Sequence, residues 1–354
     1  QSRLYDPESF PLSLWHVHGH AESWPLLNEK ERRLTPRKHL GMPTLICGSF
    51  AYDTIMMFPD RFTNYILPDQ IHALNVCFVN PQMRREFGGC AGNIAYNLKL
   101  LGGDPVPMGT VGADFTDYRD WLKECGIPDT FVREIPGIYS AQCTITTDLD
   151  NNQITAFHPG AMGEAHTNRV ADAGNMPLGI VAPDGREAML QHATDFAALN
   201  TPFLFDPGQN LPLFSKDELL AFLDQATWCV MNDYESKLLL NTVGGTLEEH
   251  TSRVDALIVT RGGEGSLIYR QGDVIEIPPA PVDDPVDPTG CGDAYRAGIL
   301  YGLEQRWGWD HTGRVASLIG AFKVEHHGNQ NHRFSRAEFK ARYEETFGYE
   351  YPAA

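Results

Sequence analysis

The chain has 354 residues, of which 42% are hydrophobic and 21% charged, and its formal net charge is −18 at pH 7. This size and composition indicate a globular protein with one large α/β domain or two domains. The acidic balance argues against a nucleic-acid-binding or anionic-membrane-binding surface, which needs a basic patch, but it permits a small anionic ligand held by a local positive field.

The seven cysteines are scattered and form no C-x-x-C pair. This spacing disfavours a disulfide scaffold or a zinc site and favours a reducing compartment. No apolar run approaches the length of a membrane span, and the first residues show no charged-then-apolar signal pattern. We therefore expect a cytoplasmic protein, a monomer or homodimer, with no nucleic-acid or membrane partner.

Residues 1–41 combine several prolines with a polar run and little periodicity, which predicts a flexible N-terminal extension. His16, His18 and His20 alternate there, but without a supporting carboxylate or cysteine they indicate a surface segment rather than a metal site. Met42 follows directly. A start codon at Met42 would make the preceding residues dispensable, and loss of activity or folding on their deletion would contradict that.

Residues 42–350 are predicted to form the main domain. Residues 44–48 indicate a buried first strand that ends at a glycine turn, with Asp53 just beyond it. In open α/β sheets ligands bind beyond the carboxyl ends of the strands, so Asp53 is placed to meet a ligand. A turn-forming aspartate is the alternative.

Segments 51–87 and 138–160 predict a small β-sheet, which we call the lid. Its expected strands are short apolar pieces and an alternating hairpin, at residues 54–58, 71–79, 142–147 and 154–157. Phe157 could cover a base or a sugar, and ordinary core packing is the alternative. Arg61, Arg84 and Arg85 lie next to turns, where a solvated surface position is expected.

Gly88 and Gly89 precede a run of apolar residues at helical spacing that ends at a second glycine pair, at 102–103. Glycine lets a ligand approach the backbone closely. Asn93 lies on the first turn of this predicted helix and offers both a donor and an acceptor, which suits vicinal hydroxyl groups.

Strand and helix patterns alternate along the rest of the domain, which predicts a mostly parallel sheet. The expected strands are 105–111, 179–182, 203–205, 228–232 and 256–260, with a hairpin over 266–269 and 274–277. The expected helices surround residues 121–125 and cover 186–199, 219–226, 315–324 and 334–347.

Asn232 and Glu235 are three residues apart at the start of a predicted helix, so their side chains share a face. They could organise Mg²⁺ through water, because this ion keeps waters and needs few carboxylates. They could equally form a capping box, and the spacing alone does not decide between the two.

The turn at residues 287–293 ends in a carboxylate and is followed at once by an apolar helical pattern. Gly290 and Gly292 free the backbone to aim N–H groups outward, and a helix N-terminus adds a positive dipole end. The turn is therefore an anion site. Asp293 would repel the anion unless it takes a proton from the group that attacks it, which indicates phosphoryl transfer. A capped helix after a loop is the plainer alternative.

Taken in order, the motifs resemble those of the ribokinase (PfkB-type) family of sugar and nucleoside kinases. They are Gly48…Asp53, Gly88-Gly89-x-x-x-Asn93, Asn232-x-x-Glu235, Thr260-x-Gly262-x-x-Gly265 and Asp287-x-Thr289-Gly290-x-Gly292-Asp293. The Walker A pattern of P-loop enzymes is absent, and no G-x-G-x-x-G of a dinucleotide-binding enzyme follows the first strand.

This resemblance implies a central, mostly parallel sheet flanked by helices (α/β/α) with a β-sheet lid, and transfer of the ATP γ-phosphoryl group to a primary hydroxyl with Mg²⁺. It implies Asp293 as the base and the backbone of Gly290, Cys291 and Gly292 as the anion hole. The implied substrate-binding residues are Asp53, Gly88, Gly89, Asn93 and Phe157. The implied nucleotide-binding residues are Asn232, Thr260, Gly262, Gly265 and Thr289, with Asn232 and Glu235 at Mg²⁺ and Asp287 near a monovalent-cation site such as K⁺.

The segments at residues 88–93 and 157–162 resemble the bacterial adenosine and nucleoside kinases more than the fructose kinases. Phosphorylation of a nucleoside 5′-hydroxyl, with adenosine first, is therefore expected. A ribokinase-like sugar kinase is the alternative enzyme. A non-catalytic ligand-binding relative is the alternative of another class, and the intact Asp293 argues against it.

Overall fold

The computed structural model describes residues 42–66, 72, 74–150 and 152–352. The expectations about residues 1–41 lie outside the described residues. Within the described part, no helix is long and apolar enough to cross a membrane.

A large sheet forms the centre of the domain. Among the described residues it has nine strands in the order β13-β12-β11-β10-β9-β8-β1-β4-β5. The seven strands from β11 to β5 are paired in parallel, and β12 and β13 are antiparallel. The bounds are β1 Thr44–Cys47, β4 Pro105–Val111, β5 Phe131–Glu134, β8 Leu178–Val181, β9 Phe203–Phe205, β10 Trp228–Asn232, β11 Ala256–Thr260, β12 Ser266–Arg270 and β13 Asp273–Ile277.

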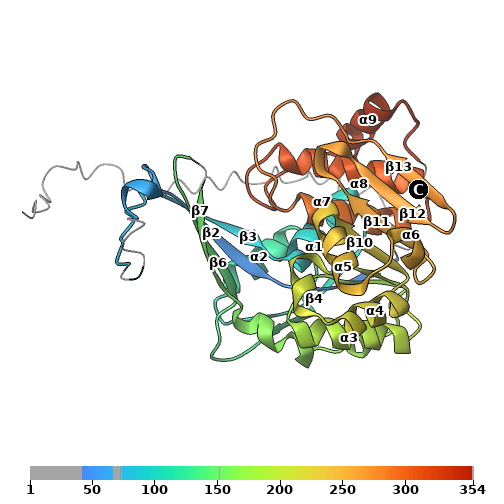
Figure 1. Ribbon diagram of the computed structural model, residues 1–354, viewed down its shortest axis with the longest axis horizontal. Helices are drawn as coiled ribbons and strands as arrows, with labels where there is room; N and C mark the ends of the chain where they lie inside the picture. The colour runs from blue at the N-terminus through green and yellow to red at the C-terminus, as the bar shows by residue number, and fades with distance from the viewer. Residues whose placement is uncertain (1–41, 67–71, 73, 151, 353–354) are drawn as a thin grey trace, which may run out of the picture. The chain divides into compact units, whose positions relative to one another are not determined.

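Helices cover both faces of this sheet (Figure 1). They are α1 Cys90–Leu101, α2 Thr116–Glu124, α3 Arg186–Ala198, α4 Lys216–Gln225, α5 Asp233–Val243, α6 Leu247–His250, α7 Cys291–Glu304, α8 Trp309–Val324 and α9 Arg336–Phe347. Side chains of β1 alternate between two cores: Ile46 packs with residues of α1, α7 and α8, whereas Leu45 and Cys47 pack with residues of α3 and α4. The predicted α/β/α architecture is confirmed.

A separate four-stranded sheet, the lid, has the order β3-β2-β6-β7. Its strands are β2 Ala51–Met57, β3 Gln82–Gly88, β6 Ala141–Thr147 and β7 Gln153–His158. Figure 1 shows them projecting from one side of the large sheet. The predicted hairpin is β6 and β7, which pair antiparallel.

One predicted lid strand is wrong. Residues 74–79 form no strand, and the second long strand is β3, whose sequence QMRREFG is mostly polar. Leu74 and Val79 are exposed, while Phe78 packs against the rings of Phe58 and Phe62. The apolar residues of this segment therefore belong to a local aromatic cluster and not to a strand. Strand β3 is partly exposed to solvent, so its sequence is mostly polar and does not show the apolar pattern used to predict strands. Strand β5 was also not predicted.

Candidate active site

The turn at residues 287–293 is held in shape by its own hydrogen bonds. The Asp287 carboxylate accepts the Thr289 N–H at 2.9 Å and the Gly328 N–H at 3.0 Å. Gly290 caps α7 with φ +79°, a conformation that favours glycine. A Cβ at Gly290 would also lie 2.7 Å from Asn329 Oδ1. The glycine is thus required both by the turn and by a neighbouring side chain.

The N–H groups predicted to form the anion hole lie at the start of α7. The N–H groups of the first helical turn have no acceptor within the helix, so those of Gly292 and Asp293 can serve an anion. The Cys291 N–H donates to the Pro288 carbonyl oxygen at 3.2 Å and closes the turn. A bound phosphoryl oxygen would have to compete for that donor.

Asp293 lies on the first turn of α7 with its side chain partly buried. Burial raises the pKa of Asp293 to about 6, opposed by the hydrogen bond from Asn93 and by the charge of Arg296. Asn93 Nδ2 donates to Asp293 Oδ2 at 2.8 Å. A carboxylate with a pKa near neutrality is suited to accept a proton from a hydroxyl group.

Asn93 is buried and bonded through both ends of its amide. Its Nδ2 contacts Asp293, and its Oδ1 accepts from Gln330 Nε2 at 2.9 Å. Gln330 in turn donates to the Tyr118 hydroxyl at 2.6 Å. The amide therefore positions Asp293 in this arrangement, and the predicted contact with a substrate hydroxyl stays a prediction.

Asp53 lies within lid strand β2, and its Oδ2 accepts from Asn329 Nδ2 at 2.9 Å. Burial raises the pKa of Asp53, and the Asn329 hydrogen bond lowers it. Gly88, on the paired strand β3, leaves the space for this contact, because a Cβ there would be 2.5 Å from Asp53 Oδ2. Gly89 has φ +85°, and a Cβ on it would be 2.5 Å from the Ser49 carbonyl oxygen.

Asn329 is a site residue that the sequence did not reveal, since its stretch was interpreted only as a break after a helix. Its Oδ1 is buried and has no hydrogen-bond partner among the described residues. A buried acceptor without a partner is costly, so a hydroxyl donor from a ligand would satisfy it. The same amide donates to Asp53 through its Nδ2, while its Oδ1 lies beside Gly290.

A buried ion pair lies under the start of α7 and was also not predicted. Arg296 donates two hydrogen bonds to Asp206, each 2.9 Å long, and both side chains are buried. Arg296 Nη2 is 3.8 Å from Glu235 Oε2. The only sequence signals were a charged residue on an apolar helix face and an aspartate directly after a strand.

Asn232 and Glu235 form the capping box that was one of the two alternatives. Asn232 Oδ1 accepts the Glu235 N–H, and Glu235 Oε2 accepts the Asn232 N–H, both at 2.7 Å. In the described part of the chain, no cluster of three or more His, Cys, Asp or Glu could hold a metal. One carboxylate beside nucleotide phosphates still fits Mg²⁺, which is usually bound by one or two carboxylates and substrate.

A pocket of about 570 Å³ adjoins the start of α7 and includes Cys291 and Gly292 in its wall. The predicted nucleotide-binding residues Thr260, Gly262 and Gly265 line it as well. The remaining wall is mainly apolar and rich in proline, from residues 279–288 and from α8. Its size and apolar lining are those of a small-molecule site, with an anion-binding helix end at one side.

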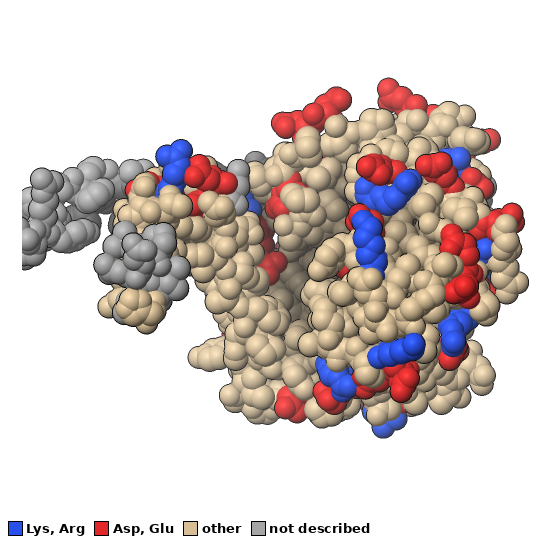
Figure 2. Space-filling view, in the orientation of Figure 1, with Lys and Arg blue, Asp and Glu red and all other residues tan. Residues whose placement is uncertain are grey.

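The lid contributes both exposed and paired side chains. Phe157 on β7 is 53% exposed, so the alternative of core packing is wrong for it. Arg61 is exposed, as expected. Arg84 is only half-exposed and approaches Asp287 at 3.8 Å, and Arg85 lies over the Tyr52 ring at 3.6 Å. Arg85 is nevertheless exposed, so the expected solvated position is confirmed for Arg61 and Arg85 and is wrong for Arg84, which is partly buried beside Asp287. Figure 2 shows the surface hollowed between the lid and the larger part of the domain.

The residues at Asp287 do not fit an added monovalent cation. The Lys323 side chain is fully buried, and its Nζ donates to the Asp287 carbonyl oxygen at 2.7 Å. A cation bound to that carbonyl would meet the ammonium group at short range, where like charges repel.

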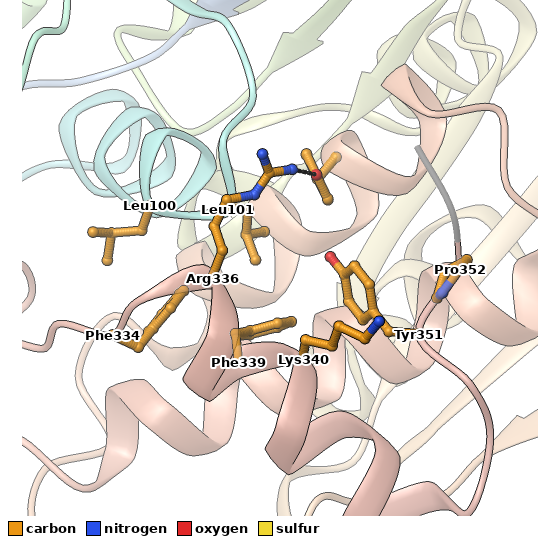
Figure 3. A pocket seen from close by; sticks show the side chains of 9 residues that line it. Leu100, Leu101, Phe334, Arg336, Phe339, Lys340, Tyr351 and Pro352 are labelled. Carbon is orange, nitrogen blue, oxygen red and sulfur yellow. Dashed lines mark hydrogen bonds between the residues drawn. The ribbon is translucent and has the colours of Figure 1, made fainter. Parts of the chain in front are cut away.

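Figure 3 shows a second, smaller pocket, with a volume of about 220 Å³. Its wall comes from the end of α1, from α7, from α9 and from the residues that follow α9. None of the predicted site residues line it, whereas the larger pocket at the start of α7 is lined by predicted nucleotide-binding residues and is the candidate nucleotide site.

A model of the pfkB family of carbohydrate kinases matches residues 50–334. The nucleoside kinase of Methanocaldococcus jannaschii is 34% identical over 253 residues, which are 71% of this chain and 83% of that protein. The nucleoside kinase of Methanothermobacter thermautotrophicus is 32% identical over 311 residues, 85% of this chain and 98% of that protein.

The solved structure of Burkholderia thailandensis nucleoside kinase in complex with inosine has a TM-score of 0.79 and 50% sequence identity. The match covers 87% of this chain and 99% of that one. A further structure of the same kinase, in complex with ADP-inosine, has a TM-score of 0.78 and 51% sequence identity, and the match covers 88% of this chain and 98% of that chain.

Proposed function

The chain belongs to the pfkB family of carbohydrate kinases, and from that premise we propose that it transfers the γ-phosphoryl group of ATP to the 5′-hydroxyl of a nucleoside. As a family member it is an ATP-dependent kinase whose acceptor is a hydroxyl group of a nucleoside or a sugar. What we propose beyond the family assignment is that the acceptor is a nucleoside. Its support is the similarity to nucleoside kinases, one of which is solved with inosine at 50% identity. A purine nucleoside is the preferred substrate class, with adenosine first.

The observation that carries the mechanism is the pair Asn93–Asp293 at the start of α7. Asn93 fixes the direction of the Asp293 carboxylate, and burial brings its pKa to about 6. At neutral pH the carboxylate is mostly ionised and can accept the proton of the attacking hydroxyl. From its position on the first helical turn, Asp293 would hold the acceptor hydroxyl near the N–H donors proposed for the transferred group.

Asp53 and Asn329 would hold the sugar from the lid side. Asp53 offers carboxylate oxygens to vicinal hydroxyls, and Asn329 Oδ1 offers a buried acceptor. Phe157, exposed on β7, is the candidate to stack on the base. These contacts would fix the distance and angle of attack, which is the main contribution of a protein to phosphoryl transfer.

The pocket lined by Thr260, Gly262 and Gly265 would take the nucleotide. A Cβ at Gly262 would meet nothing within 4 Å, so a side chain there would enter open space that the glycine leaves free. Glu235 would hold Mg²⁺ through water. When bound, this ion neutralises charge on the phosphates.

A panel of acceptors tests the proposal. Adenosine, inosine, cytidine, ribose and fructose are each supplied with ATP and Mg²⁺, and ADP formation is measured. A purine nucleoside is expected to have the highest kcat/KM. Ribose turned over far better than every nucleoside would contradict the nucleoside assignment and support a sugar kinase.

A further inference from the structure

Lys323 lies one residue before the end of α8 and is fully buried. Its ammonium donates to two backbone carbonyl oxygens, that of Asp287 at 2.7 Å and that of His326 at 3.1 Å. Lysine is almost never fully buried unless it is paired. Here the ammonium is bonded to carbonyl oxygens, the kind of ligand that binds hard metal cations, and the charges of Asp287 and Glu86 also favour its charged form.

The two carbonyls belong to the two segments that shape the active site. Asp287 begins the turn before α7, and His326 begins the loop that contains Asn329 and Gln330. The Val286 and Asp287 N–H groups also donate to the Val324 carbonyl, at 2.7 and 3.0 Å. The end of α8 thus both donates hydrogen bonds to the turn and accepts them from it. Among these four hydrogen bonds, Lys323 is the one charged group.

We propose that the Lys323 ammonium acts as a built-in monovalent cation, so that the phosphoryl-transfer site is assembled without an added alkali ion. The family resemblance implied a monovalent cation beside Asp287. In the structure the Lys323 ammonium is hydrogen-bonded to the backbone carbonyl of Asp287. The inference rests on the kinase activity of the chain but not on which acceptor it uses. Lys323 is a positioning residue because it acts through the backbone of the turn.

The charge has two effects at this place. It orients the backbone carbonyl of Asp287. The side-chain carboxylate of the same residue accepts hydrogen bonds from the N–H groups of Thr289 and Gly328. It also adds positive potential next to Cys291, the first residue of α7, whose N-terminus is the proposed anion site for the phosphoryl group. A lysine is suited to this because its ammonium is a compact point charge with three donors.

The wild-type chain supplies the first test. Activity with ATP and melting temperature are measured while K⁺ is replaced by tetramethylammonium at constant ionic strength, which keeps screening unchanged. We expect both values to stay the same. A saturable increase of either one with K⁺ would overturn the proposal. The melting temperature needs no acceptor, so this result stands even if nucleosides are not substrates.

Two substitutions supply the second test. Lys323→Ala opens space at the carbonyls, and Lys323→Met fills it with an apolar chain. We expect both to lose about 10- to 100-fold in kcat/KM, as expected when a residue that supports an active-site ligand is removed. Only Lys323→Ala should recover with K⁺ or methylammonium, because only there can a cation enter. Lys340→Ala, at an exposed position on α9, is the control for loss of a lysine and should behave as wild type.

Loss of activity in both variants without any response to cations would show a structural role only and would contradict the proposal. If Lys323→Ala does not fold, the cation exchange on the wild-type chain still decides, since it needs no substitution.

Discussion

The chemistry of Asp293 depends on side chains that lie far from it in the sequence. Asn93 holds the carboxylate, while Asp206 raises its pKa and Arg296 lowers it through their charges. Arg296 and Asp206 are themselves buried and doubly hydrogen-bonded, so these charges are fixed in place. A fixed environment of this kind sets the protonation of a catalytic group.

The pH profile of the wild-type enzyme should therefore show an acidic limb near pH 6, where Asp293 titrates. Below that pH the carboxyl is protonated and cannot accept the hydroxyl proton, so kcat/KM should fall by about tenfold per pH unit. Initial rates at subsaturating acceptor measure it. A profile that stays flat down to pH 4 would be incompatible with Asp293 as the base.

Asn93→Ala separates two roles for the amide. The Asn93 hydrogen bond lowers the pKa of Asp293, so its removal should move the acidic limb to higher pH. If Asn93 served only to hold a substrate hydroxyl, KM would rise and the limb would stay where it is. The measurement is the same pH series on the variant.

At the scale of elements, α7 is fixed by close contact with α8. Gly298 faces α8, where a Cβ would lie 2.3 Å from Ala316 Cα, and Gly302 similarly faces Thr312. Small residues at the crossing let the two helices approach, and α7 positions Asp293 while α8 positions Lys323. The packing of this helix pair thus sets the geometry of the site.

Gly298→Ala should destabilise the fold by about 1–3 kcal/mol through overpacking, although alanine is the better helix former. Urea unfolding measures the change. Gly163→Ala is the matched control, because a Cβ there would meet nothing within 4 Å. Equal stability of the two variants would mean that the helix crossing can widen at little cost.

Elements with strong periodicity were predictable, and those without it were not. The parallel strands β1, β8 and β10 are apolar runs buried on both faces, which the sequence displays directly. Strand β3 is polar because one side of the lid is solvated. It is a strand because it pairs with β2, and its composition alone does not predict one.

At the scale of the whole molecule, the loop at residues 326–331 joins the separate parts of the site. Asn329 contacts Asp53 of the lid, Gln330 contacts Asn93 of α1, and Gly328 contacts Asp287 before α7. Asn331 also contacts lid residue Glu86 at 2.8 Å. A single loop therefore ties the lid to both helices that start at the site.

The motifs before each helix could be predicted from the sequence because the glycine and aspartate residues at fixed spacing are required by the local conformation of the turn. The loop could not, because a Gly-Asn-Gln-Asn stretch has the composition of any loop. The Arg296–Asp206 pair and Lys323 were missed for a related reason. Their roles depend on contacts between residues 90 and 36 positions apart, which no local pattern encodes.

The most direct test of the account is Asp293→Asn, assayed for both turnover and nucleoside binding. The amide keeps the shape of the side chain but cannot accept the hydroxyl proton, so kcat should fall by about 10²- to 10⁴-fold. Calorimetry should show adenosine bound with unchanged affinity, since Asp53 and Asn329 are intact. Turnover close to that of the wild-type chain would contradict the central claim that Asp293 is the base.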